Sequence, residues 1–201
     1  SGVYTLTNVP AGVRTLTASA SGFSSNSVSI SVPAGQTLTA NLSLSPILPT
    51  GQIRVTLNWN KDTVGQPDDL DLHAIGPLSG GGCFEVYWNN VGNLNAAPFA
   101  QLEVDNINLS GHPPTETLRL SQTFTGVYHF FLYDYGGEYG DGIARSRATV
   151  QVYGDNGLIT SFTAPSSAGA YWHVFDLNGQ TRAITPVNTL GASPPAFTKS
   201  T

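Results

Sequence analysis

Asp69, Asp71 and His73 alternate with Leu70 and Leu72 in a chain in which only 10% of residues are charged. Residues two apart on a β-strand project from the same face. The spacing therefore predicts one polar row, with the two leucines turned toward the core. Two carboxylates side by side repel each other unless a cation or a hydrogen-bond donor lies between them. The stretch is a candidate site for a divalent cation.

Later acidic residues are expected to converge on this row. They are Asp105 in "QLEVDN" and Glu116 in "PPTETLRL", and Asn106 and Asn108 add neutral oxygens. Hard oxygen ligands in this number suit Ca²⁺, which takes six to eight of them. His73 is less typical of calcium, and it indicates either a donor to a ligand or a Zn²⁺ or Mn²⁺ site. The alternative is a solvated strand face with hydrogen-bonded aspartates.

Two further groups of residues have the chemistry of a binding site. Asp134, Glu138 and Asp141 lie in the Gly-rich stretch "YDYGGEYGDG", which indicates a second cation loop, a ligand loop or, as the favoured interpretation, a mobile hairpin. Aromatic residues that stack on sugars form the second group, although alternation along strands predicts that about half of them point inward. They are Tyr87, Trp88, Tyr133, Tyr135, Tyr139, Tyr171 and Trp172.

Evidence for catalysis is weak. The chain has no "GxSxG" nucleophile elbow and no "HExxH" zinc motif. His129 and His173 occur in aromatic stretches typical of packed strands. Cys83 has no nearby cation in the sequence to activate its thiol, so we interpret it as a small core residue. The sequence predicts that the protein is not an enzyme.

Composition limits the class of protein. The 201 residues carry a net charge of −5, with 8 basic against 13 acidic residues, which argues against nucleic-acid binding. No apolar stretch approaches the ~20 residues of a membrane helix. A single cysteine rules out an intrachain disulfide. With 40% hydrophobic residues the chain can form a folded core.

The first 45 residues differ from the rest, because Arg14 is their only charged residue. Alternating apolar residues predict four short strands, around residues 4–6, 16–20, 28–32 and 38–44. The stretch "GVYTLTNVPAGVRTLTASASGF" resembles the second half of a carboxypeptidase regulatory-like β-sandwich. That resemblance implies that 1–45 is an incomplete sandwich. Three alternatives follow: the first strands lie in upstream sequence, the second domain covers the gap, or another copy inserts a strand.

Residues 46–52 form a Pro-rich linker, and a second domain is expected over 53–187, followed by an extended tail over 188–201. Short strands are predicted near 53–59, 70–75, 84–89, 101–105, 117–121, 127–134, 146–153, 158–163 and 171–177. The ordered motifs "LNWN…PDDLDLHAIGP", "AQLEVDN", "PTETLRL", "GVYHFFLYDYGG" and "YWHVFDLNG" resemble a bacterial YfaP-type domain of unknown function. The resemblance implies a secreted or periplasmic β-rich module. The fold class is therefore all-β, with two β-sandwich domains in tandem.

Three functions remain open. The first is a structural module of an extracellular or cell-surface filament or adhesin, a homo-oligomer assembled by strand exchange and stabilised by a divalent cation, most simply Ca²⁺. Its partners would be copies of itself or neighbouring domains of a longer chain. The second is a carbohydrate-binding module that binds glycans through the aromatic residues. The third is a metal-dependent hydrolase, for which no general base is evident that is not also a candidate ligand.

Overall fold

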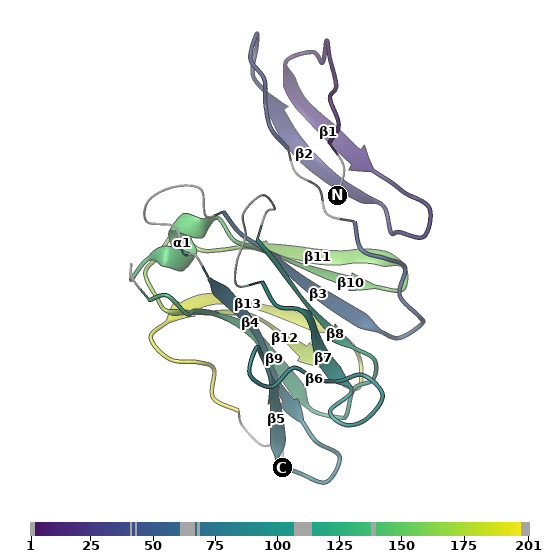
Figure 1. The fold of residues 1–201 in the computed structure, drawn as a ribbon, viewed down its shortest axis with the longest axis vertical. Helices are drawn as coiled ribbons and strands as arrows, with labels where there is room; N and C mark the ends of the chain where they lie inside the picture. Colours follow the sequence, from purple (N-terminus) through teal and green to yellow (C-terminus); the bar gives the residue numbers. More distant parts are fainter. Residues whose placement is uncertain are drawn as a thin grey trace.

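The computed structural model describes residues 3–40, 42, 44–60, 67, 69–106, 114–137 and 140–197. Two antiparallel sheets form the main body, and they pack face to face as a β-sandwich (Figure 1). The six-stranded sheet has the order β11 (Gly157–Thr163), β10 (Thr149–Gly154), β3 (Ile53–Asn58), β8 (Thr115–Leu120), β7 (Ala100–Val104) and β6 (Gly92–Asn93). The five-stranded sheet has the order β13 (Ile184–Gly191), β12 (Tyr171–Asn178), β9 (Val127–Asp134), β4 (Leu70–Pro77) and β5 (Cys83–Val86).

The core lies between the inner faces of the two sheets. As the alternation predicts, Ile53, Val55 and Leu57 are buried on one face of β3, and Leu70 and Leu72 are fully buried on β4. Large aromatic side chains fill the rest: Phe130, Phe162 and Phe175 stack with ring centroids 4.6 and 5.4 Å apart. The all-β fold class is thus confirmed, whereas the tandem arrangement of two sandwiches stays a prediction.

A short helix, α1 (Gly142–Ser146), connects β9 to β10. Arg147, with a φ of 51°, ends it in the left-handed conformation. Among the described residues, no helix has the length and apolar character needed to cross a membrane.

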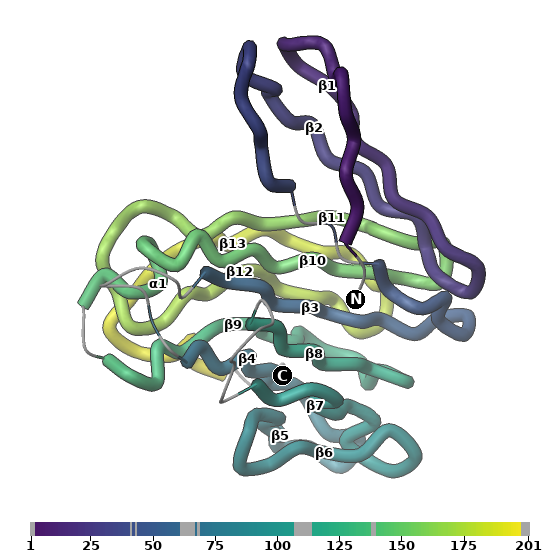
Figure 2. Tube along the Cα trace, turned by 45° about the horizontal axis from the view of Figure 1, so that its top comes forward, coloured from purple at the N-terminus to yellow at the C-terminus, as the bar shows by residue number. Residues whose placement is uncertain are grey.

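The N-terminal segment forms fewer strands than predicted. Among the described residues of this segment, β1 (Gly12–Ala18) and β2 (Asn26–Val32) are the strands, and they pair as one antiparallel hairpin that projects from the sandwich beside β10 and β11 (Figures 1 and 2). The prediction of strands around 4–6 and 38–44 is wrong for the described residues there. Asn8 takes a positive φ of 58°, and Pro10 and Pro33 lack the N–H that a ladder needs.

Two boundaries also differ from the expected ones. The predicted linker over 46–52 packs against the rest of the protein, since Leu48 is buried and Phe23 of the hairpin forms a β-bridge with Pro46. The predicted tail begins inside β13, which continues to Gly191 and pairs with β12.

Cys83 was predicted to be a small core residue, and this prediction is wrong. The residue is exposed, because it is the first residue of β5, at the rim of the sheet.

Candidate metal centre

The candidate site lies where β4 extends past its neighbour in the sheet. β5 pairs with β4 only over Ala74–Pro77, whereas β9 follows β4 from Leu70 onward. The edge of β4 at Leu72 is therefore not covered by β5. A residue of the opposite sheet pairs with the backbone there: the Leu72 N–H donates to Oε2 of Glu116, on β8, at 2.6 Å. This bond holds a buried carboxylate between the two sheets.

Asp69 and Asp71 meet Glu116 at this place. The three residues each offer one carboxylate oxygen, and these oxygens lie within 4.8 Å of one another. Two oxygens bound to the same Ca²⁺ at ~2.4 Å can be at most ~4.8 Å apart, so the spacing is compatible with one shared ion. Glu116 is fully buried and Asp71 is 2% exposed, whereas Asp69 is half-buried. The group is thus open to solvent on one side only.

Burial makes the charged forms of these acids unfavourable. It is the main cause that raises the pKa of Asp71 to about 7, and the charges of Asp69 and Asp105 add to it. Burial likewise raises the pKa of Glu116 to about 9, against the opposing effect of the Leu72 N–H. A hydrogen bond with Asp105 and the charge of Asp71 raise the pKa of Glu116 further. A cation at this place would relieve the repulsion.

One atom indicates a missing partner. Oδ2 of Asp71 is buried and has no hydrogen-bond partner among the described residues. Buried polar atoms in native proteins are nearly always satisfied, because leaving one unpaired costs ~1–3 kcal/mol or more. The donor set is entirely carboxylate oxygen, which is the chemistry that Ca²⁺ prefers. The residues therefore fit a hard divalent cation.

The other predicted ligands have different surroundings. Asp105 follows β7, is exposed, and takes part through its hydrogen bond to Glu116. His73 is not in the group: its Nδ1 lies 2.8 Å from Oε1 of Glu85, and its ring stacks on Phe131 at 4.7 Å. β4 turns Asp71 and His73 to the same face, as predicted, but β5 lies beside β4 from Ala74 onward, and Glu85 of β5 reaches His73.

The second acidic loop does not form a cluster in the described part of the chain. Asp134 is buried at the end of β9, and its Oδ1 accepts the Gly137 N–H at 3.3 Å. Asp141 pairs with Arg145 at 2.8 Å one helical turn away. Glu138 lies outside the described residues. Asp134 and Asp141 have separate structural partners.

A second group of possible ligands, which the sequence pattern does not predict, comprises His129, His173 and Asp176. A spacing of three between His173 and Asp176 predicts opposite faces of a strand. β12 has a bulge between His173 and Phe175 that brings both to the same face. No local signal in the sequence predicts that bulge.

No family model and no curated protein matches the chain. Among solved structures it is similar to a crystal structure of an unknown-function protein, SAV2460. The TM-score is 0.50 at 12% sequence identity, and the match covers 69% of this chain and 91% of that chain. At this identity the similarity shows the all-β fold alone. The YfaP-type and carboxypeptidase regulatory-like resemblances stay predictions.

Proposed function

We propose that the chain is a non-enzymatic structural module of an extracellular or cell-surface protein, and that one divalent cation stabilises its sandwich. The ligands are Asp69, Asp71, Asp105 and Glu116, and Ca²⁺ is the cation that the all-oxygen set fits best. The extracellular location follows from the YfaP-type resemblance.

The observation that carries this proposal is the buried Oδ2 of Asp71, which has no hydrogen-bond partner in the part of the chain that the structure describes. It lies among carboxylates from two strands of different sheets, so a shared ion would join β4 to β8 at the edge that β5 leaves uncovered. Such a position suits a structural ion. A hydrolytic metal needs an open coordination position and a separate general base, and here the neighbouring acids are themselves candidate ligands.

Calcium is expected to raise the melting temperature of the full chain, and chelation is expected to lower it. Binding to the folded state alone adds ~2.7 kcal/mol at a concentration 100 times the Kd. Asp71→Asn should remove most of this shift, because it deletes a buried ligand charge whose Oδ2 faces the proposed ion. Differential scanning calorimetry with calcium, magnesium, manganese or chelator measures the effect and ranks the metals.

Asp141→Asn is the matched control. It also removes one acidic charge, but Asp141 pairs with Arg145 away from the cluster, so the calcium shift should persist. Identical melting curves with and without chelator, together with no bound metal by elemental analysis, would rule out the cation.

A specific observation favours glycan binding as a second candidate function. Five aromatic side chains form a continuous cluster on the outer face of the five-stranded sheet and its adjoining loops. Neighbouring rings are 4.7 to 6.2 Å apart, and the members are Tyr87, Trp88, Tyr133, Tyr135 and Tyr171. Trp88 is 41% exposed and Tyr135 is 53% exposed, so both present apolar ring surface to solvent. Trp172 is fully buried, and Tyr139 lies outside the described residues.

If this aromatic cluster binds glycans, a polysaccharide panel should retard the chain in affinity electrophoresis, and Trp88→Ala should abolish the retardation. Stacking on an exposed indole supplies much of the affinity in such a site. Phe23→Ala is the matched control, because Phe23 is also 41% exposed but lies on the hairpin. Equal retardation of the two variants, or none for the wild type, would contradict glycan binding at this cluster.

A further inference from the structure

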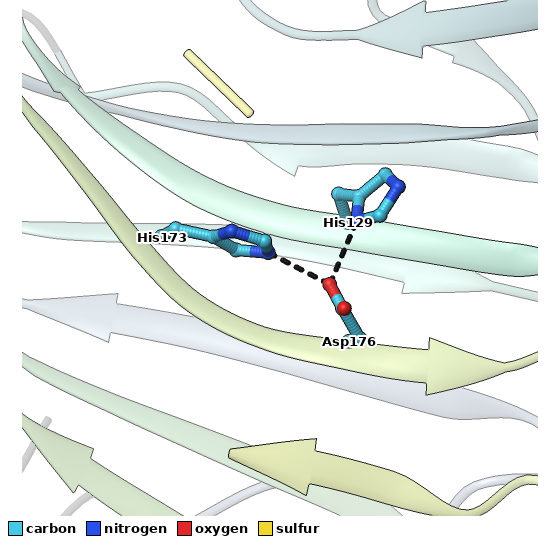
Figure 3. A group of neighbouring side chains, drawn as sticks. All are labelled: His129, His173 and Asp176. Atoms are coloured by element: carbon cyan, nitrogen blue, oxygen red, sulfur yellow. Dashed lines mark hydrogen bonds and ion pairs between the residues drawn. The ribbon is translucent and has the colours of Figure 1, made fainter. Parts of the chain in front are cut away.

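The outer face of the five-stranded sheet carries a compact group of one carboxylate and two imidazoles. Oδ1 of Asp176 lies 2.7 Å from Nδ1 of His129 and 2.7 Å from Nε2 of His173. Figure 3 shows both rings directed at this single oxygen from neighbouring strands. The ring centroids of the two histidines are 5.4 Å apart, at an interplanar angle of 77°. The group is separate from the carboxylates of the candidate metal centre.

The backbone builds this arrangement through the bulge in β12. His129 lies directly opposite Asp176 in the ladder between β9 and β12, and His173 lies opposite Phe131. The bulge inserts one residue between His173 and Phe175, and Val174 and Phe175 are both fully buried. The extra residue turns His173 and Asp176 outward together. Bulges commonly redirect side chains in this way next to functional sites.

We propose that His129, His173 and Asp176 bind one Zn²⁺ ion, or a similar borderline transition metal. Two imidazole nitrogens and one carboxylate oxygen are a ligand set typical of zinc, and a fourth position remains for water or another ligand. Imidazole is a poor ligand for Ca²⁺, so this metal differs from the one proposed at the carboxylates.

The geometry needs little change to accept the ion. All three ligand atoms lie within 4.8 Å of one another. Ligands bound tetrahedrally to zinc at 2.0–2.2 Å are ~3.3 Å apart, so each nitrogen must move ~0.6 Å from the carboxylate oxygen. The nitrogens that now donate to Asp176 would instead bind the metal, and each neutral ring would carry its proton on its other nitrogen.

Access to the group also suits a bound ion. The side chains of His173 and Asp176 are 19% and 28% exposed, whereas His129 is 11% exposed. The edge of the Phe197 ring packs against His129 with centroids 6.2 Å apart. One side of the group is therefore fixed by packing, and the other is open to solvent. A third histidine on this face, His73, meets the carboxylate of Glu85, and among the described residues it belongs to no group of three possible ligands.

The test is a titration of the metal-free full chain with Zn²⁺ and Co²⁺ in excess calcium, which would compete for the carboxylate cluster proposed above as the calcium site. Calorimetry should give one zinc per chain, and Co²⁺ should show the visible absorption of a four-coordinate site. His173→Gln and Asp176→Asn should each weaken binding at least ~100-fold, a loss at the upper end of that caused by removing a metal's supporting residues. The buried His129 is left intact so that the fold is preserved.

His73→Gln is the control variant, and it should bind zinc like the wild type. Circular dichroism and the calcium-induced rise in melting temperature show that each variant is folded. Zinc binding that is unchanged in both His173→Gln and Asp176→Asn would overturn the proposal. So would absence of zinc binding in the wild type, which would leave the three residues as a hydrogen-bonded network of the sheet.

Discussion

Without a bound cation, the free energy of unfolding is expected to fall as the pH rises from about 4 to about 9. Burial, with help from neighbouring carboxylates, raises the pKa of Asp71 from 3.8 to about 7 and that of Glu116 from 4.5 to about 9. The folded state thus binds protons that the unfolded state has already lost. Stability is then highest below the unfolded pKa values, and it decreases as each folded pKa is passed.

The size of the fall is set by the separation of the pKa values. Each pKa unit corresponds to ~1.36 kcal/mol, so Asp71 alone contributes up to ~4 kcal/mol of destabilisation at high pH. Calcium bound at the proposed site would offset this loss, because a cation stabilises the deprotonated carboxylates. The gap between the calcium and metal-free curves should therefore widen as the pH rises.

Urea unfolding of carefully demetallated protein across this pH range measures the effect. Asp71→Asn isolates it, because the other titrating groups remain in the variant. The variant should lose less stability between pH 4 and pH 9, and it should be the more stable protein at pH 8 without cation. A wild-type curve that stays flat or rises over this range, with the same shape in Asp71→Asn, would contradict the raised pKa values.

Local alternation was sufficient to predict the interior of the sandwich. The apolar faces of β3 and β4 follow directly from the period of two in the sequence, and Leu70 and Leu72 are fully buried as expected. The same rule placed Asp71 beside Asp69 and away from the leucines. These features depend only on neighbouring residues, so the sequence pattern is sufficient to predict them.

Features that depend on pairing between distant strands could not be predicted in this way. Glu116 shares the inward face of β8 with Leu118 and Leu120, and it accepts hydrogen bonds from the uncovered Leu72 N–H of the opposite sheet and from the Asn106 N–H. His73 meets Glu85 because β5 pairs with β4 from Ala74 onward. His73 was predicted at the candidate metal site from its spacing of two from Asp71, and Glu116 as a later acidic residue expected to converge on it. Neither argument encodes which strand covers which edge.

In the N-terminal segment, alternation alone predicted more strands than the described residues form. All four predicted segments alternate, yet within the described residues β1 and β2 alone form strands, because a strand also needs a partner for its backbone. Tyr4 and Ala40, in the two flanking segments, are joined by a hydrogen bond from the tyrosine hydroxyl to the alanine carbonyl. This side-chain contact does not replace a ladder.

The full chain is expected to self-associate through this hairpin. Every residue of β1 and β2 except Asn26 is at least partly exposed, including Val13 at 70% and Val28 at 37%. In the described part of the chain, β1 and β2 pair only with each other, so each leaves one edge without a ladder. A two-stranded hairpin is at best marginally stable alone, and an unpaired edge templates pairing with another strand.

A second copy of the chain is the partner that we propose for these edges. Arg14 is the only charged residue in 1–45, and depletion of charge is typical of interface cores. The extended tail is a poor donor strand, because residues 188–191 already belong to β13 and Phe197 packs on His129. Pairing at one edge gives a dimer, whereas pairing at both edges in a head-to-tail manner gives an open filament unless the rotation closes a ring.

Sedimentation velocity over a range of concentrations tests the association. The wild type should form species well above the 21.1 kDa monomer, and Val13→Lys combined with Val28→Lys should return it to the monomer. Lysine on an exposed edge strand opposes pairing with another chain, because its charge would be buried. Ile159→Lys is the control, since Ile159 is 53% exposed on β11, which is also an edge strand. A wild type that stays monomeric, with amides protected from hydrogen exchange across 12–32, would overturn self-association, because the hairpin would then be stable without a partner.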